Sequence, residues 1–157
     1  MTLLSADDLF ISLHETLADI SAREWDALNI DDYPFASYAF LHALEISGCV
    51  GGDSGWQPVF ICIREGKDGP LKAAMPAYVK YHSYGEYVFD HSWAHAFERA
   101  GGNYYPKLLA AIPFTPVPGP RLLRRPEDSA LDTMLIAAFQ QITRNHNLSS
   151  AHINFIT

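Results

Sequence analysis

The sequence predicts a single α/β domain in which helices and strands alternate along one chain. Its 157 residues are enough for one domain with a sizeable core. Hydrophobic residues make up 48% and charged residues 18%, which is typical of a globular chain and not of a disordered one. Two apolar runs joined by a short turn predict a β-hairpin, and segments with helical periodicity lie on both sides of it.

The predicted hairpin is the strongest strand signal. Its first strand, Trp56–Arg64, is apolar on both faces, which is typical of a central strand. The turn Glu65–Gly69 leads into the second strand, Leu71–Tyr81. Because proline cannot donate a hydrogen bond to a ladder, Pro76 predicts an edge or a bulge in that strand.

Helices are predicted from capping signals and apolar periodicity. Ser21–Glu24 and Ser129–Asp132 both have the pattern of a capping box, in which a serine hydroxyl and an acidic side chain bind the first free amides. Gly48 and Gly101 supply stop signals. The expected helices are residues Ser21–Leu28, Phe35–Ser47, His91–Ala100 and Ser129–Asn145.

Further strands are predicted from short apolar runs. They are Leu9–Leu13, Lys107–Ile112 and Ala151–Ile156, with a brief strand-like run at Tyr87–Phe89. The last strand has the composition of a central one. A domain rarely ends on such a strand, so we expect the chain to be a fragment or one half of a larger protein.

A proline-rich loop follows the predicted strand Lys107–Ile112. Residues 104–125 hold five of the ten prolines and three arginines, and they lead into the helix predicted from Ser129. Helix N-termini attract anions, and arginine forks bind phosphate. The loop therefore predicts a site for a phosphate-bearing ligand, although it has neither the P-loop nor the dinucleotide glycine pattern. The alternative is a stiff connector with solvated arginines.

Composition limits the partners and the compartment. Eleven basic and 18 acidic residues give a net charge of −7, which argues against an extensive nucleic-acid face. No segment has the pattern of a signal peptide or the length of a membrane span. Cys62 lies in an apolar run, where a buried reduced thiol is expected. These features predict a cytoplasmic protein.

Two polar clusters are candidates for chemistry. Glu86 and Asp90 lie near His82 in an aromatic segment, where a carboxylate can act as a general base; the alternative is that they cap loops. His91, His95 and Glu98 share one helix face and have the spacing of metal ligands. The apolar residues of that helix lie roughly opposite, so we favour a polar helix face and predict no metal site.

Several segments resemble the FemAB-like family of peptidoglycan biosynthesis, which consists of bacterial proteins of the GNAT-like acyl-CoA N-acyltransferase superfamily. The resemblance begins near Ile20 and runs to the end of the chain. The motifs that carry it are Glu24–Asp26, Pro34–Phe35, Trp56, Gly85–Asp90, Trp93–Ala94, Arg99–Gly101, Tyr104–Leu108, Pro113–Pro116 and Gly119–Leu123.

The resemblance implies a GNAT-like fold, with a mixed and mostly antiparallel central sheet flanked by helices. Such proteins usually carry two similar domains, so residues 1–157 are expected to form a single N-terminal GNAT-like domain, cut off before a second similar half. In that fold the donor's phosphates bind between a central strand and the next helix. The proline-rich loop occupies this position, where the superfamily normally has glycines.

The resulting hypothesis is transfer of an acyl or aminoacyl group from acyl-CoA or aminoacyl-tRNA to an amine, with modification of a cell-wall precursor as the expected context. No tightly bound cofactor is expected, with acyl-CoA as a co-substrate, and homo-oligomer formation is left open. A non-catalytic binding module and a metal-dependent hydrolase are the alternatives. The expected base is Glu86 or Asp90, and the expected donor-binding residues are Lys107, Thr115, Gly119, Arg121 and Arg124.

Overall fold

The computed structural model describes residues 8–86 and 90–157. They form an open six-stranded sheet in the order β1-β2-β3-β4-β6, with β5 beside β3; only β4 and β6 pair in parallel. The strands are β1 (Leu9–His14), β2 (Trp56–Glu65), β3 (Leu71–Lys80), β4 (Lys107–Ala110), β5 (Leu123–Arg124) and β6 (Ala151–Ile153). The α-helices are α1 (Ala22–Asp26), α2 (Tyr38–Ile46), α3 (His91–Arg99) and α4 (Leu131–Asn145). Short 3₁₀ helices are η2 (Leu17–Asp19), η3 (Pro34–Ala36), η4 (Gly52–Ser54) and η5 (Pro126–Asp128).

This architecture confirms the predicted mixed domain with a mostly antiparallel sheet, and it is consistent with a GNAT-like fold. The hairpin β2–β3 is formed as predicted, and β2 lies inside the sheet between β1 and β3. The strand-like run Tyr87–Phe89 lies outside the described residues. In that part of the chain which the structure describes, no helix is long and apolar enough to cross a membrane.

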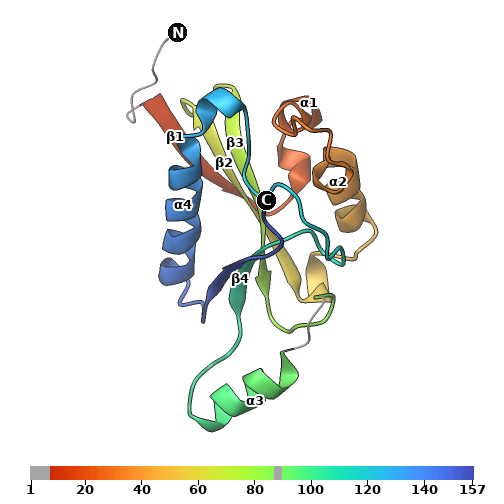
Figure 1. Cartoon of the computed structure of the whole chain (residues 1–157), viewed down its shortest axis with the longest axis vertical. Coiled ribbons are helices and arrows are strands. Elements are labelled where there is room, and N and C mark those ends of the chain that lie inside the picture. Colours follow the sequence, from red (N-terminus) through yellow and green to blue (C-terminus); the bar gives the residue numbers. More distant parts are fainter. Residues whose placement is uncertain (1–7, 87–89) are drawn as a thin grey trace.

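The two faces of the sheet are covered by different helices (Figure 1). Side chains alternate along β2: Phe60 and Cys62 pack with α1 and α2, whereas Ile61 and Ile63 pack against α4. All four side chains are fully buried, and burial of Phe60, Ile61 and Ile63 contributes about 1.5–3 kcal/mol for each. Cys62 is a free thiol, as predicted, and burial raises its pKa to about 12.

The expectation of an edge strand or bulge at Pro76 is wrong. β3 is an interior strand, and Pro76 lies opposite Phe60 in regular register. On its other side, β5 pairs with residues 73–74 and β4 with residues 78–80. Pro76 thus falls in the gap between two short partners, where no ladder hydrogen bond is needed. The irregularity in this hairpin lies instead between Ile63 and Arg64.

The two capping boxes have different outcomes. Ser21 caps α1 as predicted, its hydroxyl accepting from the Glu24 amide at 3.4 Å. The Glu24 carboxylate, however, binds Arg64 and the amide of Leu71, and so ties α1 to the hairpin. The second box is wrong: α4 begins at Leu131 without a side-chain cap, and Asp132 binds an arginine instead.

Two further elements differ from expectation. The final strand, expected to be central and to reach Ile156, ends at Ile153 and lies at an edge of the described sheet. On α3, the apolar side chains of Trp93 and Phe97 are exposed, and Ala94 is the buried residue. Figure 1 shows that α3 stands away from the sheet.

Candidate functional site

A row of unusual residues crosses three neighbouring strands at one end of the sheet. Trp56 on β2 lies opposite Lys80 on β3, and Lys80 lies opposite Lys107 on β4. Both lysines are buried. Like charges directly opposite each other destabilise a sheet, and buried charges require partners. The surroundings of this row therefore show how the two cations are accommodated.

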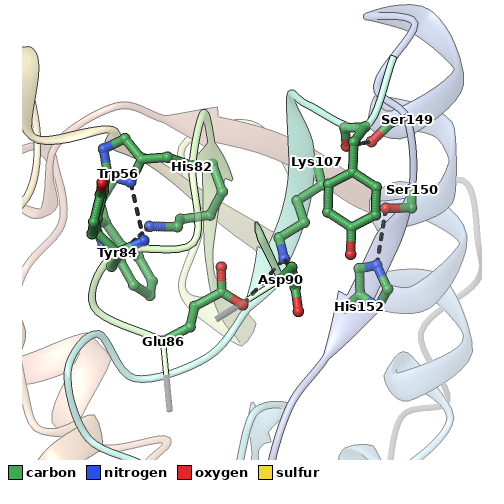
Figure 2. Close-up of polar contacts among 11 residues, drawn as sticks. Trp56, His82, Tyr84, Glu86, Asp90, Lys107, Ser149, Ser150 and His152 are labelled. Carbon is green, nitrogen blue, oxygen red and sulfur yellow. Dashed lines mark hydrogen bonds and ion pairs between the residues drawn. The ribbon is translucent and has the colours of Figure 1, made fainter. Parts of the chain in front are cut away.

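Lys107 is neutralised by two carboxylates from the segment before α3. Its Nζ lies 2.7 Å from Asp90 Oδ2 and 3.2 Å from Glu86 Oε2 (Figure 2). The side chain of Lys107 is only 4% exposed and that of Glu86 only 9%. Burial alone would lower the pKa of Lys107, but the hydrogen bonds and charges of Asp90 and Glu86 outweigh it and raise that pKa.

The two carboxylates have opposite pKa shifts. Burial raises the pKa of Glu86 despite the nearby charge of Lys107. Burial also acts on Asp90, but there the hydrogen bond and charge of Lys107 prevail and lower its pKa. Glu86 Oε1 is buried and has no hydrogen-bond partner within the described chain. Environments that push two pKa values apart are typical of acid–base sites, with Glu86 as the group able to exchange a proton.

Glu86 lines a cleft beside the parallel strands β4 and β6, which extends from the first residue of β4 to the segments that follow both strands. Two cavities, of 310 Å³ and 210 Å³, share Glu86, Asn154 and Phe155 and so form its two ends. The larger end is mostly apolar and is lined by Trp56, Leu109, Ala111, Ile112, Phe114, Thr115 and Pro116, with Gly85. The smaller end is polar and is lined by Asp90, Tyr104, Lys107 and His152.

The polar end holds two more titratable groups. Burial raises the pKa of Tyr104, and its hydrogen bond to Asp90 acts in the same direction. Burial lowers the pKa of His152, and the charge of Lys107 adds to that effect, against the opposing charge of Asp90. His152 also lies 2.9 Å from the hydroxyl of Ser150, as Figure 2 shows. The imidazole of His152 thus lines the same cavity as Glu86.

The residues predicted to bind donor phosphates do not lie together in the structure. Arg121 is fully buried, and its guanidinium donates to the carbonyls of Val117, Pro120 and Asn154. The amide of Gly119 donates to the carbonyl of Phe155 at 2.9 Å. These donors hold the proline-rich loop against the end of the chain.

Two other residues predicted to bind the donor, Arg124 and Thr115, lie in different places. Arg124 makes a two-pronged ion pair with Asp132 at 2.8 Å, outside the cleft. Thr115 lines the cleft, although its hydroxyl donates to the carbonyl of Pro113. Of the predicted site, the structure brings together Glu86, Asp90, Lys107 and Thr115. Donor binding by Arg121, Arg124 and Gly119 stays a prediction, and their intramolecular contacts do not favour it.

The histidine face of α3 shows no clustered ligands. His95 and Glu98 are 4.0 Å apart and both are largely exposed, whereas the ring of His91 packs against Tyr84. Among residues 8–86 and 90–157, no group of three or more metal-binding side chains comes together.

Three features of the site escaped sequence reasoning: Lys80, His152 and the cleft wall at Trp56. Lys80 carries a detectable signal, because it lies two residues after Tyr78 and therefore on the core face of its strand. His152 and Trp56 carry no comparable signal. Their role depends on the register of β2, β3, β4 and β6, which pairs residues far apart in sequence.

The fold and the cleft together describe a mixed α/β domain with a buried lysine and two carboxylates in a cleft beside two parallel strands. The model of the FemAB-like family, described as peptidoglycan biosynthesis/recognition, matches residues 16–157, and the chain belongs to this family. Searches of curated proteins and of solved structures gave no significant match.

Proposed function

We propose that this domain transfers an acyl or aminoacyl group from a phosphorylated carrier to an amine of a peptidoglycan-related molecule. The observation that carries the proposal is Glu86: one carboxylate oxygen is buried in the cleft without a partner, and burial raises the pKa of the group. A buried acceptor of this kind is matched by a ligand N–H, and an attacking amine provides one.

The proposed step is direct attack. The amine nitrogen forms a bond to the carbonyl carbon of the donor, and the carbonyl electrons move onto oxygen. Glu86 Oε1 accepts the proton that the amine loses. When the tetrahedral intermediate collapses, the C–S bond of a thioester or the C–O bond of an ester breaks. The leaving thiolate or alkoxide takes up the proton from Glu86, so that an amide, a free carrier and the Glu86 carboxylate remain.

Lys107 and Asp90 support this step without touching the donor. Lys107 binds Glu86 through Oε2, which leaves Oε1 directed to other partners. Asp90 supplies the negative charge that keeps the Lys107 ammonium in place. The ammonium also opposes the rise in the Glu86 pKa that burial causes.

The apolar end of the cleft suits the acyl part of the donor. Its walls include the rings of Trp56 and Phe114, whose centroids lie 5.5 Å apart. The carrier is acyl-CoA or aminoacyl-tRNA. The net charge of −7 favours a small carrier, and a tRNA donor would bind with a steep dependence on salt. Because both carriers are cytoplasmic, the proposal places the reaction in the cytoplasm.

Calorimetry with CoA, acetyl-CoA and aminoacyl-tRNA tests donor binding, and turnover with an amine acceptor tests the chemistry. We expect Glu86→Gln to keep donor affinity and to lower kcat about 100-fold or more, because glutamine cannot accept the proton. Glu127→Gln, in the exposed η5, is the matched control and should leave kcat unchanged. Absence of binding by all three ligands would overturn the proposal.

A recognition module without catalysis is the second candidate. It is favoured by the proline-rich loop, whose Arg121 side chain and Gly119 amide are engaged within the protein. A module of this kind would bind peptidoglycan fragments with equal affinity in the wild type and in Glu86→Gln, and it would show no turnover with either carrier.

A further inference from the structure

Glu86 enters the cleft from a tight turn formed by residues 83–86. The Glu86 amide donates to the carbonyl of Ser83 at 3.1 Å and closes the turn. Gly85, the third residue, has a φ of +81°, the value of a type II turn. A Cβ at Gly85 would lie 2.4 Å from Cε1 of Phe114, so glycine is required for space as well as for its φ. Both constraints fix the central peptide of the turn, whose carbonyl belongs to Tyr84.

The carbonyl of Tyr84 accepts two hydrogen bonds from the sheet. The indole Nε1 of Trp56 donates to it at 2.9 Å, and Nζ of Lys80 donates to it at 2.8 Å. A carbonyl oxygen has two lone pairs, so both donors can be satisfied. The donors come from neighbouring strands, β2 and β3, in which their residues lie directly opposite each other. Figure 2 shows Trp56 and Tyr84 on the side of Glu86 away from His152.

Burial of the Lys80 amine costs free energy of folding unless the amine has a partner, such as the Tyr84 carbonyl. Lys80 is fully buried and lies opposite Lys107, a second cation, on the neighbouring strand. Its Nζ lies 3.6 Å from the ring centroid of Trp56, which supplies a cation–π contact. Burial lowers the pKa of Lys80 to about 7, against the attraction of Glu86. A buried apolar residue would avoid this cost but could not hold the turn.

We propose that Lys80 and Trp56 are positioning residues, which clamp the carbonyl of Tyr84 and thereby hold Glu86 in the cleft. The clamp fixes the turn from one side, while Lys107 holds Glu86 Oε2 from the other. With both contacts in place, the unpartnered Oε1 stays inside the cavity. This positioning of Glu86 does not depend on which reaction the cleft performs.

The test uses two variants of the full chain, Lys80→Met and Trp56→Phe. Each removes one donor to Tyr84 and keeps a similar shape; the phenylalanine also leaves every charge unchanged. Amide hydrogen exchange is measured by NMR at Tyr84 and Glu86. We expect about tenfold faster exchange at both amides in each variant. The Trp25 amide in α1, which donates to the carbonyl of Ser21, should exchange at its wild-type rate. Lys72→Met, on the same strand but paired with the exposed Glu65, is the control.

A carboxyl NMR titration of the Trp56→Phe variant separates positioning from simple packing. If the turn is released, Glu86 becomes solvated and its raised pKa falls toward the ordinary value of 4.5. Unchanged exchange at both amides, or a Glu86 pKa that stays at its wild-type value, would overturn the clamp. That outcome would not affect the proposed transfer reaction. Conversely, absence of donor binding would overturn the transfer reaction but not the clamp. If Lys80→Met does not fold, Trp56→Phe gives the same two readouts.

Discussion

Replacing Lys107 by methionine leaves the carboxylates of Glu86 and Asp90 without their cation. In the wild type, one ammonium lies 2.7 Å from Asp90 and 3.2 Å from Glu86. Methionine fills a similar volume but supplies no charge and no hydrogen-bond donor. We expect the variant to fold with a lower free energy of unfolding.

The size of the loss follows from burial. Removing one partner of a buried ion pair costs about 3–5 kcal/mol, because the other charge stays desolvated. Glu86 is 9% exposed and Asp90 is 21% exposed, so water can relieve part of the cost at Asp90. We therefore expect a loss of about 3 kcal/mol near neutral pH. Lys72→Met is the control: its pair with Glu65 has exposed fractions of 26% and 41%, and its loss should stay below about 1 kcal/mol.

The loss should also depend on pH. Without Lys107, both carboxyl groups lose the charge that lowers their pKa, so their folded pKa values rise above the unfolded ones. The folded variant then binds more protons than the unfolded chain, and it loses stability as pH rises through these values. Urea unfolding at about pH 4.5 and about pH 7.5 measures this, with the larger difference from wild type at the higher pH. If wild type and variant differ in free energy of unfolding by the same amount at both pH values, or by less than about 1 kcal/mol, the stabilising ion pairs of Lys107 with Glu86 and Asp90 would be refuted.

Gly85, Arg121 and Lys80 give three further predictions. Gly85→Ala should lower the free energy of unfolding by about 1–3 kcal/mol and disturb the cleft, because its Cβ would meet Phe114. At Gly48, the control position, a Cβ meets no atom within 4 Å, so Gly48→Ala should cost about 1 kcal/mol. Thermal unfolding compares the two variants. Arg121→Met should cost at least about 2 kcal/mol, since three carbonyls lose their donor, while the exposed Arg125→Met should stay within about 0.5 kcal/mol in the same assay. Lys80 has a folded pKa of about 7 against 10.5, so between these values the unfolded chain binds more protons and wild-type stability rises with pH, by at most about 1.4 kcal/mol per unit. Lys80→Met should lack this rise in urea unfolding from about pH 6.5 to 9, and an identical pH profile would contradict the burial of the amine.

Local patterns predicted the elements well, because hydrophobic periodicity and capping depend on residues that are close in the sequence. The alternation of Phe60, Ile61, Cys62 and Ile63 shows a strand buried on both faces, and the structure places helices on both sides of it. Long-range contacts account for the errors. Pro76 is tolerated inside the sheet only because β4 and β5 leave a gap beside it, and no local pattern encodes that gap.

The site was predicted in part for the same reason. Glu86 and Asp90 stand out as carboxylates in an aromatic segment, but their common partner, Lys107, is a distant residue that sequence reasoning grouped with the arginines. Charge and proline content drew attention to Arg121. Its burial against three carbonyls depends on how the proline-rich loop folds back on the chain end, which composition cannot show.

A carbon-13 NMR titration of the Glu86 and Asp90 carboxyl groups tests whether Glu86 can serve as the base of the cleft. If burial raises the pKa of Glu86 and Lys107 lowers the pKa of Asp90, Glu86 will titrate above 4.5 and Asp90 below 3.8. The Glu86 signal can be assigned from its loss in Glu86→Gln. Ordinary pKa values for both groups, or a Glu86 pKa below that of Asp90, would contradict the assignment of Glu86 as the base of the cleft.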